Sequence, residues 1–236
     1  MRLDKFLAQN GYGTRSEVKK ILKTGSITIN GVPAGKPEFK VDPERDTICC
    51  GGKPIVYEPF LCLMLNKPAD CVTAASDRMH KTVMDYIDHP RRDELFPVGR
   101  LDIDTEGLLL LMNDGDLAHR MLSPRHHVEK TYFVRTEGKI TEEDAAAFAE
   151  GVDIGEKNNT LPARLKILKS DSFSEAELTI CEGKFHQVKR MFESRGKRVT
   201  YLKRISMGPI VLDTSLAPGQ WRTLTKEETE ILCRKC

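Results

Sequence analysis

The chain has 236 residues, of which 39% are hydrophobic and 31% are charged, and its formal net charge is +2. These values are typical of a soluble globular protein that forms one large domain or two smaller ones. No apolar stretch approaches the roughly 18 residues of a membrane span, and the N-terminus lacks the apolar region of a signal peptide, so we expect neither a membrane protein nor a secreted one.

The seven cysteines are odd in number and irregularly spaced. This pattern favours reduced thiols in the cytoplasm over a disulfide framework. Cys233 and Cys236 form a C-x-x-C pair, but no second pair or matching histidines could complete a zinc site. The sequence therefore predicts a cytoplasmic protein without a metal.

Two short helices are predicted at the N-terminus. The first has apolar residues at helical spacing from Leu3 to Leu7 and ends at Asn10. The second begins with a capping box, in which Thr14 is followed three residues later by Glu17. Asn-Gly in SITINGVPA then indicates a β-hairpin. We expect residues 1–58 to form a small domain that ends in a linker, CCGGKPIVYEP (residues 49–59), and residues 59–236 to form a second domain.

The second domain shows short apolar or alternating segments typical of strands, separated by segments typical of helices. We expect strands at 61–66, 108–112, 128–136, 165–168 and 175–180, with Tyr132 and Phe133 on opposite faces of their strand. Asp116 is expected to cap one helix, and Thr141 with Asp144 three residues later is expected to begin a second, which Gly151 ends. A third helix is expected over 187–196, with Val188, Met191 and Phe192 facing the core, and a last one after Thr225. Because strands and helices interleave irregularly, the pattern favours an α+β fold.

Basic residues gather in two places. Residues 1–23 hold six basic side chains against two acidic ones, and residues 184–204 hold eight against Glu193 alone. Two such clusters on a nearly neutral chain predict surfaces that face a polyanion, although each alone is equally typical of a solvated helix face.

The stretch GRLDIDTEGLLLLMNDGD (residues 99–116) has carboxylates at alternate positions, as a calcium loop does. The ninth and twelfth positions counted from Asp102 are Leu110 and Asn113, which excludes that site. Paired carboxylates, Asp102 and Asp104, could also serve a glycoside hydrolase, but a single tryptophan and 6% aromatic residues do not support a sugar site. Asp102 as a lone nucleophile or base is the remaining hypothesis.

The segment RLDKFLAQNGYGTRSEVKKILKTGSITINGVPA resembles the small RNA-binding module found in ribosomal protein S-four and tyrosyl-tRNA synthetases. In that family the second helix and its preceding turn meet the RNA backbone. The resemblance implies RNA contacts by basic and polar side chains that suit phosphate, namely Arg2, Lys5, Arg15, Ser16 and Lys19.

The segment VGRLDIDTEGLLLLMNDGDLAHRMLSPRHHVEKTYFV is similar to the signature region of bacterial pseudouridine synthases of the ribosomal small-subunit branch, and so are LNKP, EGKFHQVKRMF and LAPGQWRTLTKEE. The resemblance implies a catalytic domain with a mixed, mainly antiparallel sheet flanked by helices. It also implies an isomerisation of uridine to pseudouridine, which needs no cofactor. Asp70, where the family has glycine, is expected to keep the left-handed turn.

The resemblance assigns roles to individual residues. Asp102 is the invariant catalytic aspartate, and Lys189 is expected to form an ion pair with it. Tyr132 is expected to stack on the uracil of a flipped-out nucleotide. Arg100 is expected to hold the flipped RNA conformation, and Arg190 is expected to bind RNA.

The sequences of these motifs match the small-subunit branch better than the large-subunit branch. The expected substrate is therefore 16S ribosomal RNA or a small-subunit assembly intermediate. A 23S ribosomal RNA substrate and a non-catalytic assembly factor that binds ribosomal RNA are the alternatives. We expect a cytoplasmic monomer without membrane contact.

Overall fold

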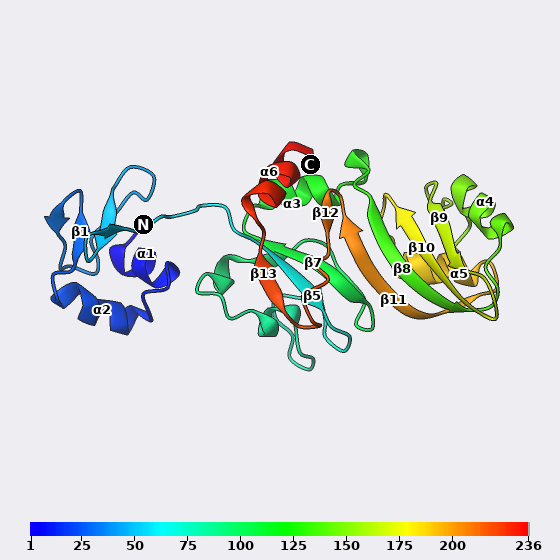
Figure 1. The fold of residues 1–236 in the computed structure, drawn as a ribbon, viewed down its shortest axis with the longest axis horizontal. Helices are drawn as coiled ribbons and strands as arrows, with labels where there is room; N and C mark the ends of the chain where they lie inside the picture. Colours follow the sequence, from blue (N-terminus) through cyan, green and yellow to red (C-terminus); the bar gives the residue numbers. More distant parts are fainter. Residues whose placement is uncertain (236) are drawn as a thin grey trace. The chain divides into compact units, whose positions relative to one another are not determined.

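The computed structural model describes residues 1–235 and divides into two compact units (Figure 1). The first unit contains Met1–Phe60 together with Asp88–Glu94, and the second contains Leu61–Ile87 and the chain from Leu95 onward. Cys236, one half of the C-x-x-C pair, lies outside the described residues. Within residues 1–235, no helix has the length and apolar character needed to cross a membrane.

The first unit packs two helices on a four-stranded sheet of order β2-β1-β3-β4. Its elements are α1 (Leu3–Gln9), α2 (Arg15–Lys23), β1 (Ile27–Ile29), β2 (Val32–Pro33), β3 (Ile48–Cys50) and β4 (Lys53–Pro54). The predicted capping box is confirmed, because the Thr14 side chain accepts from the Glu17 backbone N–H and the Glu17 carboxylate accepts from that of Thr14. Asn30 and Gly31, with φ of 51° and 82°, make the predicted turn between β1 and β2.

The stretch predicted as a linker is in large part a β-hairpin. β3 pairs with β1 on one side and with β4 on the other. The turn between β3 and β4 is made by Gly51 and Gly52, whose φ values of 56° and 78° suit a two-residue hairpin turn. The linker prediction is therefore wrong for residues 49–54, because the glycines that suggested flexibility close a turn.

The second unit is built on one strongly curved sheet, with strand order β13-β5-β7-β11-β8-β10-β9 (Figure 1). β6 pairs with β7, and β12 pairs with β11. Neighbouring strands are antiparallel except β7 and β11, which are parallel, so the expected mixed, mainly antiparallel sheet is confirmed. The strands are β5 (Cys62–Lys67), β6 (Phe96–Pro97), β7 (Glu106–Met112), β8 (Lys130–Glu137), β9 (Arg164–Lys169), β10 (Phe173–Ile180), β11 (Arg198–Met207), β12 (Ile210–Val211) and β13 (Trp221–Thr223).

Helices and short 3₁₀ turns connect these strands. They are η1 (Val83–Tyr86), η2 (Arg92–Glu94, in the first unit), α3 (Gly115–Leu122), η3 (Pro124–His126), α4 (Glu142–Glu150), α5 (Gln187–Glu193) and α6 (Lys226–Lys235). The capping box of Thr141 and Asp144 is confirmed at α4. The predicted cap of α3 is wrong: Asp114 caps it by accepting from the Leu117 N–H at 2.9 Å, and Asp116 lies inside the first turn.

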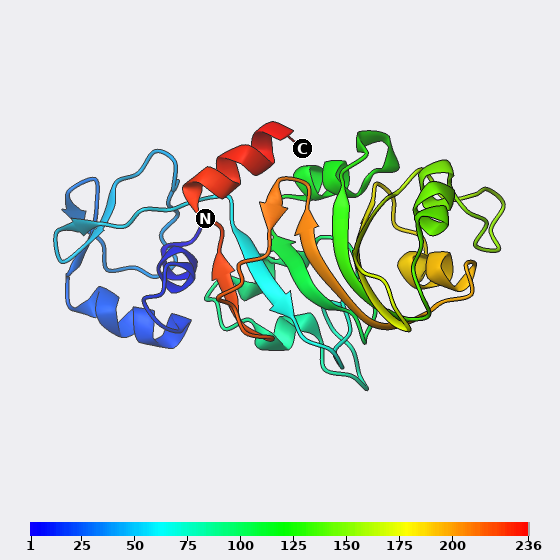
Figure 2. The same cartoon turned by 45° about the vertical axis from the view of Figure 1, so that its right-hand side comes forward.

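α5 lies in the concave side of the sheet, where the strands curl around it (Figure 2). Val188, Met191 and Phe192 are buried in the core, as their spacing predicted. Phe192 also meets Phe148 of α4 edge to face, with ring centroids 5.2 Å apart. These contacts fix the position and rotation of α5, and hence the direction of its polar face.

The one parallel contact in the sheet depends on Gly107. The register pairs Arg204 of β11 with Gly107 of β7. A Cβ atom at Gly107 would lie 2.3 Å from the Arg204 carbonyl oxygen, and the φ of 102° also favours glycine. The glycine that gave the DIDTEG stretch its likeness to a calcium loop therefore allows two strands to approach closely.

The C-terminal segment is fixed to the unit by a cluster of charged side chains. Arg222 of β13 donates to the carboxylates of Asp213 and Glu228, each at 2.7 Å. Hydrogen bonds from Ser215 and Arg222 lower the pKa of Asp213 to about 2. The folded protein therefore holds this carboxylate in its ionised form more strongly than the unfolded chain does.

We expect Asp213→Asn to remove an acid-sensitive part of the stability. Because the pKa of Asp213 is lowered by folding, its carboxylate stabilises the folded protein at pH values above the ordinary pKa of aspartate. This contribution is lost as the pH falls from about 4 towards the pKa of the folded state. Urea unfolding between pH 6 and pH 2 should therefore show a difference between wild type and variant that shrinks below about pH 4. A difference that stays constant with pH would contradict this explanation.

Candidate active site

Asp102 lies on a loop that is fastened to the rest of the second unit by backbone hydrogen bonds. The Thr73 hydroxyl bonds both the N–H and the carbonyl of Leu101, at 3.1 and 2.9 Å. The Thr105 N–H donates to the Asp102 carbonyl at 3.1 Å. Leu101 is buried in the core, while the Asp102 side chain remains 26% exposed. The backbone of the loop is therefore held in place, and the Asp102 carboxylate remains partly exposed.

A buried lysine fixes the same loop from inside the unit. The Nζ atom of Lys67, at the end of β5, donates to the carbonyl oxygens of Pro68, Ile103 and Thr105 at 2.9, 3.3 and 2.9 Å. Lys67 is fully buried, and burial lowers its pKa. We did not predict that Lys67 holds this loop. The sequence Asn-Lys-Pro at residues 66–68 identifies a motif, but it does not show which groups the lysine ammonium contacts.

Lys189 of α5 brings a cation to Asp102 and to a second carboxylate. Its Nζ lies 3.4 Å from the Asp102 Oδ2, so the predicted ion pair is confirmed. The shorter contacts go to Asp104, at 2.6 and 2.8 Å. Burial acts to raise the pKa of Asp104, but the hydrogen bond and charge of Lys189 outweigh it and lower that pKa. Lys189 is thus shared between two carboxylates.

His186 approaches Asp102 from the other side. Its Nε2 lies 3.6 Å from the Asp102 Oδ1, and its ring stacks on Phe185 with centroids 3.8 Å apart. His186 precedes α5 with a left-handed backbone, at φ of 50°. The sequence offered a signal for this residue in EGKFHQVKRMF, but we assigned no role to it.

Tyr132 lies on the inward face of β8, where it is 7% exposed and belongs to the hydrophobic core. The alternation of β8 is confirmed, since Phe133 lies on the other face. Opposite Tyr132 in register is Arg204, which is 2% exposed and whose Nε donates to the Leu108 carbonyl at 2.8 Å. The role of Tyr132 in stacking stays a prediction.

The two arginines predicted to bind RNA in this unit differ in their surroundings. Arg100 is exposed on the loop that carries Asp102. Arg190 instead donates to the Glu156 carboxylate at 2.8 Å, to the Phe185 carbonyl at 3.0 Å and to the Ile154 carbonyl. These bonds join two segments of the protein and leave Arg190 less free to bind RNA than we expected.

The predicted RNA-binding residues of the first unit lie on or beside its two helices. Lys5, Arg15, Ser16 and Lys19 are exposed. Arg2 forms a bidentate pair with the buried Asp4, at 3.0 and 2.9 Å, and this hydrogen bonding lowers the pKa of Asp4. The guanidinium of Arg2 therefore has a structural partner in addition to any contact with RNA.

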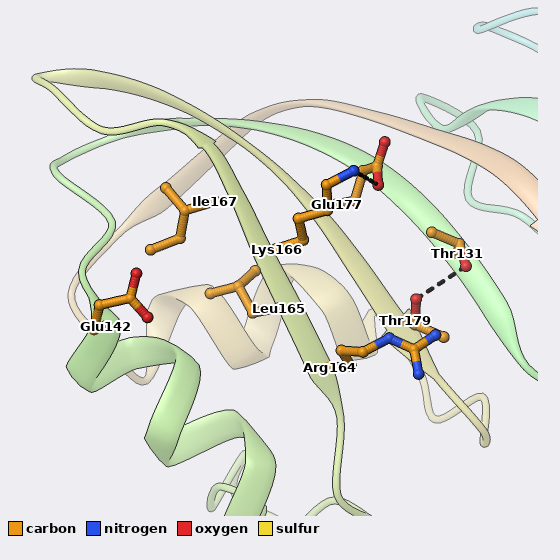
Figure 3. A pocket seen from close by; sticks show the side chains of 8 residues that line it. All are labelled: Thr131, Glu142, Arg164, Leu165, Lys166, Ile167, Glu177 and Thr179. Atoms are coloured by element: carbon orange, nitrogen blue, oxygen red, sulfur yellow. Dashed lines mark hydrogen bonds and ion pairs between the residues drawn. The ribbon is translucent and has the colours of Figure 1, made fainter.

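A hollow of about 530 Å³ lies elsewhere in the second unit, on the side of β9 and β10 (Figure 3). Lys166 is paired with Glu177 there, and the hydroxyls of Thr131 and Thr179 bond each other. The Lys166–Glu177 pair lies on exposed strands, and the residues that line the hollow include no buried lysine like Lys67 to fix a carboxylate from beneath. Across residues 1–235, no group of three or more histidine, cysteine, aspartate or glutamate side chains is arranged to hold a metal ion.

The chemistry available at Asp102 follows from this geometry. A carboxylate that is held in a fixed position, is partly exposed and has a lysine ammonium 3.4 Å away can act as a nucleophile or as a base. The structure brings Asp102 and Lys189 together and adds Asp104 and His186 to them.

Comparison with known proteins gives similarities over both units. Residues 62–194 match the RNA pseudouridylate synthase family, and residues 1–48 match the S4 domain. An uncharacterised RNA pseudouridine synthase of Bacillus subtilis is 48% identical over 98% of both chains. The ribosomal small subunit pseudouridine synthase A of Escherichia coli is 42% identical over 97% of this chain and 98% of its own. A crystal structure of a pseudouridylate synthase matches with a TM-score of 0.69 and 42% identity, covering 98% of this chain and 99% of its own.

Proposed function

Since the chain belongs to the RNA pseudouridylate synthase family, we propose that it converts one uridine of 16S ribosomal RNA to pseudouridine, with Asp102 as the catalytic group. Membership of this family makes the protein an RNA-modifying isomerase with an S4 domain. The family and the fold expected from the sequence are thereby confirmed, while the target RNA and the residue roles belong to the proposal.

The observation that carries the proposal is the setting of Asp102. Its loop is held by Thr73 and Lys67, and its carboxylate is partly exposed beside Lys189. A catalytic carboxylate needs both a fixed position and access to substrate. A carboxylate on a merely solvated turn would need neither the buried lysine beneath it nor a cation beside it.

The reaction breaks the bond between the sugar C1′ and N1 of uracil, turns the base, and forms a bond from C1′ to C5. C5 loses its hydrogen as a proton and N1 gains a proton, so substrate and product have the same composition and no electrons enter or leave. Asp102 either adds to C1′ or removes a proton from the sugar. In both versions the ionised carboxylate acts, and Lys189 stabilises its negative charge.

The target nucleotide has to leave its stack so that Asp102 can reach the sugar. Tyr132 then stacks on the uracil, and Arg100 holds the displaced RNA backbone. The exposed basic side chains of the first unit add contacts to phosphate, which give affinity without sequence information. A ribosomal RNA substrate also implies that the protein works in the cytoplasm.

The choice of 16S ribosomal RNA is supported by the similarity to the Escherichia coli small-subunit enzyme over nearly the whole chain. A uridine in 23S ribosomal RNA is the second candidate. A non-catalytic assembly factor is disfavoured, because such a protein would not need to keep Asp102 and Lys189 in contact.

Carbodiimide mapping of pseudouridine tests the proposed substrate. The protein is incubated with unmodified 16S ribosomal RNA, both naked and bound to ribosomal proteins, and with unmodified 23S ribosomal RNA. Primer extension should then reveal one new stop in the 16S RNA and none in the 23S RNA. A stop only in 23S RNA would replace the proposed substrate, and tight binding without any new stop would favour the assembly factor.

A further inference from the structure

We propose that Phe185, backed by His186, is a stacking platform for an unpaired base of the RNA beside the target nucleotide. The inference rests on the proposed function, since it assumes that RNA is bound with its target sugar at Asp102. It adds a binding subsite outside the catalytic group of Asp102, Lys189 and Tyr132.

The first observation is an exposed aromatic ring close to the catalytic carboxylate. The side chain of Phe185 is 72% exposed. Its ring lies nearly parallel to that of His186, with an interplanar angle of 19° and centroids 3.8 Å apart. His186 in turn reaches Asp102, with 3.6 Å between its Nε2 and the carboxylate. The stacked pair of Phe185 and His186 therefore begins beside the Asp102 carboxylate and ends at the exposed ring of Phe185.

The second observation is that the segment carrying Phe185 is held in place although its ring is in solvent. Arg190 donates to the Phe185 carbonyl and is itself fixed by Glu156. The Gln187 side chain accepts from the Lys184 N–H at 2.9 Å and donates to the Glu182 carboxylate at 2.9 Å. Side chains before and after Phe185 thus fix its backbone, which limits the entropy that binding would cost.

The backbone of His186 adds a third observation. Its φ of 50° lies in the left-handed region, which is uncommon for residues other than glycine. Such strained conformations cluster at binding and catalytic sites. In the structure, His186 has this left-handed backbone while its ring stacks on that of Phe185.

An unpaired nucleobase is the ligand that best fits this surface. Every base presents a flat π-face, and stacking on an exposed aromatic ring requires no particular sequence. The chain around Phe185 is basic and polar, with Lys184 and His186 as its neighbours and Lys189 on the next turn. The ammonium groups of Lys184 and Lys189 are already bound to protein oxygens, so the ring of Phe185 is the contact that this segment offers to RNA. An apolar protein partner would require a wider apolar patch.

The stacked base belongs to a neighbour of the target nucleotide. Asp102 has to reach the sugar of the target, and the His186 ring occupies the space between Asp102 and Phe185. A base on the outer face of Phe185 is therefore too far from Asp102 to be the one isomerised. The platform would hold the strand next to the target in its unpaired form.

The test compares three variants, Phe185→Ala, Phe185→Leu and Phe185→Trp, with the control Phe173→Ala. The control removes a phenylalanine of β10 that is 63% exposed, against 72% for Phe185. Loss of one stacking contact should raise the Kd and KM for the RNA by about 5- to 100-fold in Phe185→Ala. Phe185→Leu should resemble the alanine variant, because an apolar side chain without a ring cannot stack. Phe185→Trp should restore binding, and Phe173→Ala should bind as wild type does.

A direct readout uses RNA with 2-aminopurine at each position flanking the target uridine, bound to Asp102→Asn protein so that the RNA stays unmodified. Stacking on Phe185 should quench the fluorescence at one flanking position, and adding Phe185→Ala should abolish the quenching. Unchanged Kd in Phe185→Ala, or wild-type binding by Phe185→Leu, would overturn the inference. Both readouts measure binding, so a failure of the platform is distinguished from a failure to find pseudouridine in the mapped RNA.

Discussion

Replacing Asp102 by asparagine is expected to lower kcat by about 10⁴-fold or more, because the proposed mechanism has no other group to act on the sugar. Asparagine has nearly the same size but carries no negative charge and cannot serve as a base. The fold and the Kd for RNA should remain close to those of wild type, since Asp102 makes no buried side-chain hydrogen bond that the substitution would break. Single-turnover assays of pseudouridine formation on the mapped RNA measure this effect.

Asp104→Asn is the matched control. The two carboxylates lie two residues apart on one loop and share Lys189, and Asp102 in addition lies 3.6 Å from the Nε2 of His186. Removing Asp104 frees Lys189 to pair with Asp102 alone, so the loss of activity should stay below about tenfold. If Asp104→Asn were inactive and Asp102→Asn active, the catalytic role would belong to Asp104.

Lys67→Met is expected to reduce both stability and activity, although Lys67 touches no substrate. The substitution leaves the carbonyls of Pro68, Ile103 and Thr105 without their shared donor, and we expect the free energy of unfolding to fall by about 3 kcal/mol. Without these hydrogen bonds, the loop would also hold Asp102 less firmly in position. A displacement of about 1 Å would lower kcat about 10²-fold.

Lys166→Met provides the control for Lys67→Met, because Lys166 is an exposed lysine of the same unit that pairs with Glu177 at the surface. Its unfolding in urea and its kcat should match those of wild type. Normal activity in a Lys67→Met protein that is folded at the assay temperature would show that the loop holds its shape without the ammonium group. In that case Lys67 would be a stabilising residue only.

The features that could be predicted from the sequence are those with local causes. A capping box places its two partners three residues apart, so α2 and α4 were found from Thr14–Glu17 and Thr141–Asp144. The turn at Asn30–Gly31 also follows from the residues themselves. The left-handed backbone of Asp70, at φ of 61°, was expected from the resemblance, because the family usually has glycine at that position. Local signals fail where two compete, as at α3, where Asp114 and Asp116 could both cap.

The parts that could not be predicted depend on contacts between distant segments. Lys67 precedes the carbonyls it bonds by up to 38 residues, and Lys189 lies 85 residues from Asp104. The parallel pairing of β7 with β11 has no signature in either strand. The resemblance to a family identified Asp102 and Lys189, but it did not reveal that Asp104 shares the lysine or that His186 lies beside the catalytic group.

Because β7 pairs with β11, we expect the proposed catalytic residues to come together only late in the synthesis of the chain. The Asp102 loop leads into β7, and α5 leads into β11, so the two segments meet only when these strands are joined at Gly107. A growing chain can fold its RNA-binding unit while residues 198–207 are still unmade, and it then has Asp102 without a docked Lys189. We expect nascent chains truncated before β11 to bind RNA and leave its uridines unmodified. If so, the order of synthesis alone would make the chain able to bind RNA before it is able to modify uridine.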